Sequence, residues 1–149
     1  MRLLIALLTA FAFILPVTAA ETFDDPVKLV EHIYAHYSDG TIDQLDQNAH
    51  WSPRLAALVA TDDERGELGS LTFDPFINSQ EGYLADLSIE TVAVSDTGVV
   101  VAVTFDNGGG PQTSHFSLVP GPEGWKIDEI EGVTPGREWK LSDVLAQPL

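Results

Sequence analysis

The hydrophobic pattern of this 149-residue chain changes its period near Leu84, and this change constrains the fold more than any other feature. Before Leu84, apolar residues recur every three to four positions, as on one face of an α-helix. After Leu84 they alternate with polar residues, as on a half-buried strand. Helices that precede the strands, rather than alternate with them, indicate an α+β fold with N-terminal helices packed on a mainly antiparallel sheet.

The first helix is expected to begin after an aspartate and to end at a glycine. Asp24 or Asp25 can accept hydrogen bonds from the free amides of the first turn, and Pro26 suits the first helical position. Gly40 favours the left-handed conformation that ends a helix. One face of this helix carries the apolar residues Val30, Ile33, Tyr34 and Tyr37.

A second helix is expected from Ser52, which is followed by a proline that again suits the first helical position. This helix should not extend far past Glu64, because carboxylates at a helix C-terminus oppose the helix dipole. Residues 41–50 and 66–82, on either side of the helix, are rich in turn-forming residues. We expect both segments to be irregular, with room for a short helical turn in the first of them.

About four antiparallel strands are expected after Leu84, connected by turns rich in glycine, proline and aspartate. The alternation changes phase near Thr91, which predicts a β-bulge and a bent sheet. The tail, residues 138–145, is expected to form a short closing helix or an arm. In the last strand, strict alternation predicts two faces, one with Trp125, Ile127 and Glu129 and the other with Lys126, Asp128 and Ile130.

The first twenty residues have the layout of a secretory signal peptide. A positively charged start precedes the apolar run Leu3–Leu15, and small residues follow it. The run is shorter than the about 20 apolar residues of a membrane-spanning helix. We therefore expect residues 1–20 to be a signal peptide, cleaved after Ala19 or Ala20. Residues 21–149 are expected to form a single α+β domain in the periplasm, or outside the cell.

The chain has no cysteine, and its 23 Asp and Glu residues far outnumber its 7 Lys and Arg residues. Packing alone must hold the core, and there is neither a lipid-bearing cysteine nor a cysteine ligand for zinc. The net charge of −16 favours solubility or basic partners and repels nucleic acid and anionic lipid. We expect no nucleic-acid partner, no membrane anchor after cleavage, no cofactor and no metal.

Four short motifs resemble a family of small exported bacterial proteins and lipoproteins, the domain of unknown function 3828 family. The resemblance implies a cystatin-like fold related to the nuclear-transport-factor-2-like roll, and it implies no activity. This chain departs from the lipoprotein members because it lacks their lipid-bearing cysteine. The motifs are Tyr34 with Tyr37, Ser52-Pro53-Arg54-Leu55, Phe73-Asp74-Pro75-Phe76 with Gln80, and Trp125-Lys126-Ile127-Asp128-Glu129-Ile130.

Two places carry residue types that support chemistry in other proteins. His32 and His36 lie four positions apart on the first helix, a spacing that lets two imidazoles bind one metal, but no further ligand is evident.

Asp62 continues the apolar face of the second helix if the helix reaches it. A buried carboxylate there would have a raised pKa and could act as an acid or a base. The alternative is an exposed residue in a frayed helix end.

A binding cleft is expected between the second helix, the loop of residues 74–80 and the sheet, because loops on a rigid scaffold collect binding residues. Arg54 is one of few cations and should pair with a carboxylate, whereas Asp74 precedes a proline and suits an Asx turn. Asp128 would pair with His115 of the neighbouring strand if the register allows it. The residues expected to bind a ligand are Arg54, Asp74, Gln80 and Asp128.

The sequence contains no nucleophile elbow, no phosphate-binding glycine loop and no cysteine nucleophile. We therefore name no catalytic residue and expect a non-catalytic module that binds a protein or a small ligand in the cell envelope. Two alternatives stay open. One is an acidic inhibitor or immunity-type protein that acts against a basic cell-envelope enzyme. The other is a small hydrolase or isomerase that uses an aspartate or a histidine.

Overall fold

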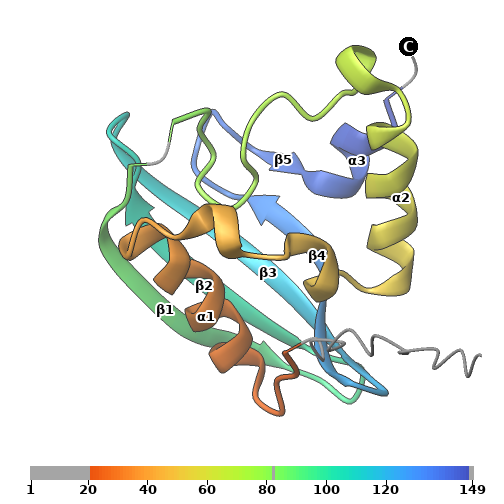
Figure 1. The fold of residues 1–149 in the computed structure, drawn as a ribbon. Helices are drawn as coiled ribbons and strands as arrows, with labels where there is room; N and C mark the ends of the chain where they lie inside the picture. The colour runs from red at the N-terminus through yellow and green to blue at the C-terminus, as the bar shows by residue number, and fades with distance from the viewer. Residues whose placement is uncertain (1–20, 82, 148–149) are drawn as a thin grey trace, which may run out of the picture.

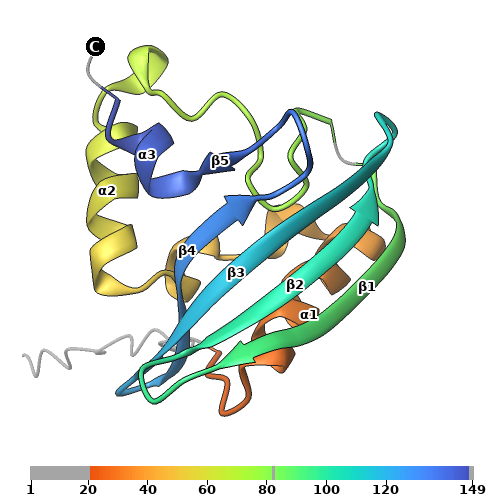
Figure 2. The same cartoon turned by 180° about the vertical axis from the view of Figure 1, so that it is seen from behind.

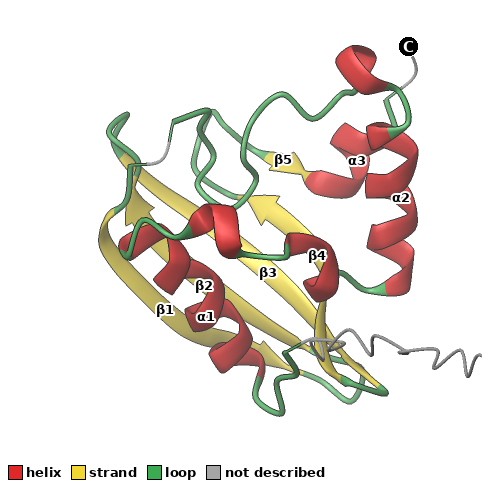
Figure 3. Ribbon diagram, in the orientation of Figure 1, coloured by secondary structure: helices red, strands yellow, loops and turns green. Residues whose placement is uncertain are grey.

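The computed structural model describes residues 21–81 and 83–147, so the predicted signal peptide lies outside the described residues. The predicted α+β class is confirmed, with five strands in place of about four and with a short closing helix (Figures 1 and 3). Along the chain the elements are α1 (Pro26–Ser38), η1 (Ile42–Gln44), η2 (Gln47–His50), α2 (Pro53–Asp63), η3 (Gly66–Leu68), β1 (Ala85–Val94), β2 (Val99–Asp106), β3 (Pro111–Gly121), β4 (Gly124–Gly132), β5 (Trp139–Lys140) and α3 (Leu141–Leu145).

The five strands form one antiparallel sheet in which each strand pairs with its neighbour in the sequence, in the order β1-β2-β3-β4-β5. In Figure 1, α1 lies across the face of β1 and β2, while α2 and α3 lie beyond β4. The opposite face of β1, β2 and β3 has no described helix over it (Figure 2). None of the helices in the described part of the chain is long and apolar enough to cross a membrane.

Both long helices begin at residues that the sequence predicts as caps. Asp25 Oδ1 accepts a hydrogen bond of 2.8 Å from an amide in the first turn of α1. Ser52 Oγ accepts one of 3.1 Å from Leu55 N at the start of α2. The amide of Ser52 also donates to the carbonyl of Ile127 at 2.7 Å, which joins the start of α2 to β4. The α2 helix ends at Asp63, as expected for a segment that ends in carboxylates.

The predicted bulge near Thr91 is confirmed. The register of β1 against β2 shifts between Thr91 and Ala93. Two further irregularities are unexpected. The register of β1 against β2 also shifts between Ala85 and Ser88. A bulge lies in β4, where Ser117 and Leu118 of β3 pair with Glu129 and Ile127. The residue between these two partners, Asp128, is therefore the extra residue of a β-bulge.

The bulge at Asp128 changes the face on which its neighbours lie. Ile127 and Ile130 are both fully buried, although strict alternation would put them on opposite faces. The predicted alternation is therefore wrong in β4. The predicted pair between Asp128 and His115 is also wrong, because His115 pairs with Glu131 in the sheet.

The core is organised around a stack of aromatic rings between the helices and the sheet. Trp51 stacks on Phe76 with ring centroids 5.3 Å apart, and Phe76 stacks on Phe116 at 6.1 Å. The hydroxyl of Tyr34 donates a hydrogen bond of 2.5 Å to the carbonyl of Phe76. The loop that contains Phe76 is therefore part of the core, and it is positioned by packing rather than by regular secondary structure.

Candidate functional site

Arg54 and Asp128, two of the four predicted site residues, form an ion pair where α2 meets β4. Arg54 Nε lies 3.2 Å from both carboxylate oxygens of Asp128 and its Nη2 donates to the Asp128 carbonyl. Ser52 Oγ donates to Asp128 Oδ1 at 2.6 Å. Partial burial raises the pKa of Asp128, but the Ser52 hydroxyl and the Arg54 guanidinium outweigh it and hold that pKa below its ordinary value. The cluster fixes the start of α2 to the bulge.

The other two predicted residues, Asp74 and Gln80, lie in the loop between η3 and β1. Asp74 Oδ1 accepts from Phe76 N at 2.9 Å, which is the predicted Asx turn. Its other oxygen accepts a hydrogen bond of 2.5 Å from the hydroxyl of Tyr37. Burial raises the pKa of Asp74, and the bonds from Tyr37 and Phe76 only partly offset this effect. Gln80 is exposed and donates to the carbonyl of Thr72 at 2.9 Å.

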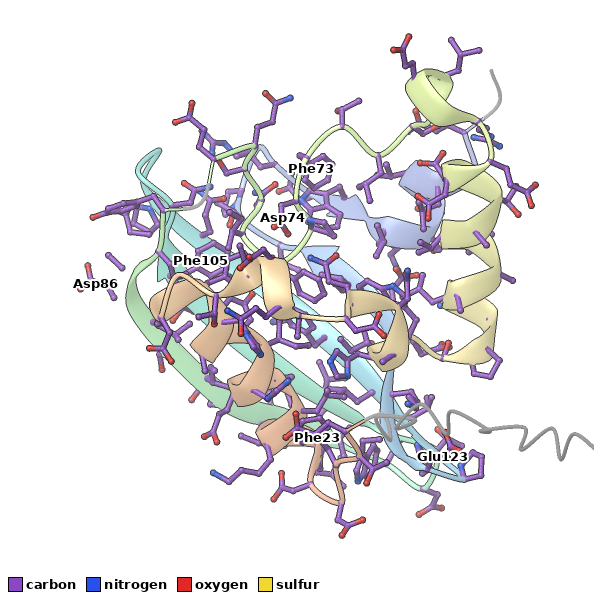
Figure 4. The ribbon with its side chains drawn as sticks, in the orientation of Figure 1. Phe23, Phe73, Asp74, Asp86, Phe105 and Glu123 are labelled. Carbon is purple, nitrogen blue, oxygen red and sulfur yellow. The ribbon has the colours of Figure 1, made fainter. Side chains whose placement is uncertain are left out.

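The four predicted residues therefore lie in two separate places, with Arg54 and Asp128 as an ion pair and with Asp74 and Gln80 in one loop but not bonded to each other. No hydrogen bond or ion pair among the described residues joins Arg54 and Asp128 to Asp74 and Gln80. Figure 4 shows Asp74 beside Phe73 in the loop over one end of the sheet. Both sets of residues have an internal structural role, and they do not share a cleft.

A hollow of about 330 Å³ does lie beside α2, where the cleft was expected, but different residues line it. We call it the α2 hollow. Its walls are α2, the segment that joins η1 to η2, and the beginning of the loop that contains Asp74. The third wall, for which the sheet was predicted, is instead formed by Leu141 at the start of α3. The lining residues are Leu45, Asp46, Gln47, Asn48, Trp51, Val59, Asp63, Leu71, Pro75 and Leu141.

Asp62 lies in the last turn of α2 and is buried, so the helix does reach it. Its carboxylate accepts hydrogen bonds from Ser70 N at 2.7 Å and from Leu71 N at 3.0 Å, and Arg65 Nη1 lies 3.3 Å away. Burial raises the pKa of Asp62, but these amides and the guanidinium outweigh it and lower the pKa below its ordinary value. Both expectations for Asp62 are therefore wrong, the exposed residue in a frayed helix end and the buried acid with a raised pKa. Asp62 instead anchors the segment that follows α2.

His32 and His36 belong to a larger group of rings. The centroids of His32 and His36 are 4.9 Å apart, and His50 lies 5.6 Å from His32. Phe23 packs on His32 at 4.9 Å, and Glu21 Oε2 lies 3.5 Å from His32 Nε2. Within the described residues, no group of three or more histidine, aspartate or glutamate side chains is placed to hold a metal ion.

A network of buried and half-buried amides lies at the end of the sheet, and no sequence motif indicates it. Asn78 donates to Gln112 Oε1 at 2.8 Å and accepts from the Trp139 indole at 3.1 Å. Asn107 donates to the carbonyl of Ile77 at 3.1 Å. These bonds hold the loop against the sheet and satisfy polar groups inside the protein. The positive φ of Asn78, 51°, is a conformation that asparagine tolerates, but no sequence pattern indicates the partners.

Together, these contacts define an α+β domain with one sheet, helices on one of its faces and a polar-rimmed hollow beside α2. No protein-family model matches the chain, and comparison with curated proteins and with solved structures yields no match either. The resemblance to the domain of unknown function 3828 family stays a prediction. The function is therefore argued from the chemistry of the hollow and of the clusters around it.

Proposed function

We propose that this protein is an exported, non-catalytic binding module of the periplasm that holds a protein partner in the α2 hollow. The single observation that carries the proposal is the contrast between the hollow and the surrounding polar clusters. The hollow has an apolar wall and two exposed carboxylates, Asp46 and Asp63, at its rim. Concave sites with apolar walls and a few polar groups are typical of ligand and partner binding.

The polar clusters support a non-catalytic role because their reactive groups are engaged inside the protein. Asp62 is held by two backbone amides and Arg65, and Asp128 is held by Ser52 and Arg54. Asp74 has a raised pKa, which would suit a general acid, but it is bound to Tyr37 and is not among the residues that line the hollow. A carboxylate that acts on a substrate must reach it.

The first alternative, an acidic inhibitor of a basic cell-envelope enzyme, draws its support from the net charge of −16. Such a protein would associate rapidly at low salt, because opposite net charges steer the encounter. We would test it with lysozyme as the basic enzyme. Loss of lysozyme activity, with an association rate that falls steeply as salt rises, would favour this alternative over a module that binds without inhibiting.

The main proposal is tested by photo-cross-linking in cells of the organism that encodes the protein. Gln47, a lining residue of the hollow, is replaced by p-benzoylphenylalanine, and cross-linked proteins are identified by mass spectrometry. The matched control has the same cross-linker at Asp86, an exposed residue that projects from the opposite edge of the molecule (Figure 4). We expect adducts from Gln47 that are absent from Asp86. Identical adducts at both positions, or none, would contradict the proposal.

A further inference from the structure

The floor of the α2 hollow is rigid and apolar. Trp51 is 6% exposed and is held by its stack on Phe76. Leu141 and Pro75 are buried beside it, and the half-buried side chains of Leu45, Val59 and Leu71 present the accessible apolar surface of the hollow. Residues that are already fixed by the core lose little freedom when a partner packs on them, which favours binding. This floor suits an aliphatic or aromatic group rather than a strongly hydrated one.

The rim of the hollow carries negative charge that the described residues do not neutralise. Asp46 lies on one side and Asp63, the last residue of α2, lies on the other. Among the described residues, neither carboxylate takes part in an ion pair or a side-chain hydrogen bond. Arg65, close to Asp63 in sequence, is engaged with Asp62 and with the carbonyl of Gln147 at 2.9 Å.

The α2 helix adds to this negative potential. Its C-terminal carbonyl groups carry the negative end of the helix dipole, and Asp63 and Glu64 place two further charges at that end. Negatively charged side chains at the negative, C-terminal end of a helix dipole destabilise the helix. A cation bound between Asp63 and Asp46 would relieve this repulsion. The charge arrangement therefore complements a positively charged group.

We infer that the α2 hollow binds the side chain of a lysine or arginine presented by a partner protein. The methylene stem would pack on the half-buried side chains of Leu45, Val59 and Leu71. The charged end would reach Asp46 and Asp63 at the rim. Lysine and arginine combine these two properties, because their stems are apolar and their charged ends stay near water. This inference rests on the proposed function, since it names the chemistry of the partner that the hollow holds.

The test uses the isotope-labelled protein and two short peptides that differ only in charge. One is an acetylated glycine-lysine-glycine amide, and the other has norleucine in place of the lysine. We expect the lysine peptide to shift the amide signals of residues 45–48 and the indole signal of Trp51. The norleucine peptide should bind at least about fivefold more weakly, because it lacks the attraction to the carboxylates.

Four variants make the test specific. Asp46→Asn and Asp63→Asn should each weaken binding of the lysine peptide about fivefold. Asp86→Asn removes the same charge at the far edge of the molecule and should leave binding unchanged. Asp63→Lys should remove the preference for lysine and favour a glutamate peptide instead. A lysine at a helix C-terminus is favourable, so this variant is expected to fold.

Two results would overturn the inference. One is equal binding of the lysine and norleucine peptides, and the other is lysine binding that Asp46→Asn and Asp63→Asn leave as strong as Asp86→Asn does. Neither result would contradict the proposed function, which fails only if the cross-linker at Gln47 captures nothing specific. A specific adduct at Gln47 with no preference for lysine would mean that the partner binds through apolar contacts alone.

Discussion

Ser52 Oγ donates a hydrogen bond of 2.6 Å to Oδ1 of Asp128, which lies 76 residues later in the chain. The same hydroxyl accepts the amide of Leu55, so one side chain caps α2 and also holds the bulge of β4. Arg54 pairs with the same carboxylate. These contacts explain why the start of α2 lies against β4.

Replacement of Asp128 should destabilise the protein more than replacement of Arg54. Asp128→Ala leaves the Ser52 hydroxyl without its acceptor and removes the main ion-pair partner of Arg54, which keeps only Glu129 at 3.6 Å and a backbone carbonyl. We expect a loss of about 1–3 kcal/mol in the free energy of unfolding. The Arg54 side chain is 48% exposed. Arg54→Ala should therefore cost less than about 1 kcal/mol, as for other exposed ion pairs. Urea unfolding of both variants measures the difference, and equal losses would contradict this account of the cluster.

Asp62 and Asp63 are adjacent, yet replacement of Asp62 should destabilise the protein and replacement of Asp63 should be nearly neutral. Asp62→Asn weakens the acceptor of two amides and Arg65 in a buried position, and we expect a loss of about 1–3 kcal/mol. Asp63→Asn removes an exposed carboxylate at a helix C-terminus and should change stability by less than about 0.5 kcal/mol, or raise it slightly. Thermal unfolding separates the two, and a larger loss at Asp63 would show that the ends of α2 are misassigned.

The core should depend strongly on Phe116, which is fully buried and stacks on Phe76. Phe116→Ala should cost about 3–5 kcal/mol, because a large cavity forms in a core that has no disulfide to support it. Val94→Ala, at a side chain that is 75% exposed, is the control and should be nearly neutral. A loss below about 1 kcal/mol for Phe116→Ala in urea unfolding would mean that the strand faces are assigned wrongly.

Stability should fall as the pH drops below about 6.5. Burial, with smaller contributions from His32 and Lys126, lowers the pKa of His50 from 6.5 to about 4, although Asp46 and Glu21 oppose the change. Between these values the unfolded chain binds a proton that the folded chain does not. Folding is therefore favoured above pH 6.5 and loses up to about 3 kcal/mol as the pH falls to about 4.

His50→Gln tests the source of this pH dependence. The variant should flatten the curve of unfolding free energy against pH in that window, because no imidazole remains at the buried position. His115→Gln, in β3 and outside the group of rings around His32, is the control and should keep the wild-type curve. If the two variants give the same curve, the pH dependence comes from other groups.

The signal peptide stays a prediction that can be checked directly. Expressed in a Gram-negative host, the exported protein should begin at Ala20 or Glu21, after cleavage that follows Ala19 or Ala20. N-terminal sequencing of protein from the periplasmic fraction is the measurement. An intact Met1 on exported protein would contradict both the signal peptide and the proposed periplasmic location.

Much of the local structure could be predicted from sequence because it depends on neighbouring residues. The caps at Asp25 and Ser52, the end of α2 near Glu64, and the bulge at Thr91 all follow from side chains within a few positions of one another. The pairing of Arg54 with a carboxylate was expected from the scarcity of cations, and the structure identifies Asp128 as its nearer partner, with Glu129 at 3.6 Å.

The bulge at Asp128 and the α2 hollow could not be predicted in the same way. The residues around Asp128 alternate regularly in sequence, but Ile127 is joined to Ser52 by a backbone hydrogen bond, and Asp128 bonds the same residue through its side chain. The two-residue strand β5 is too short to carry a periodic pattern. The α2 hollow is assembled from separate segments of the chain, and its residues share no local motif.

The sequence by itself determined the order of helices and strands, their caps and turns, and the acidic character, because these depend on local hydrogen bonding, hydrophobic period and composition. Only the tertiary structure decided which carboxylates are used internally and which face solvent. Asp128 is satisfied by Ser52 and Arg54 from a distant part of the chain, and Asp62 by Arg65 and by two amides of the loop that folds back on α2, whereas Asp63 has no such partner among the described residues. Those partners come together only when burial of the core brings α2, β4 and the connecting loops into contact.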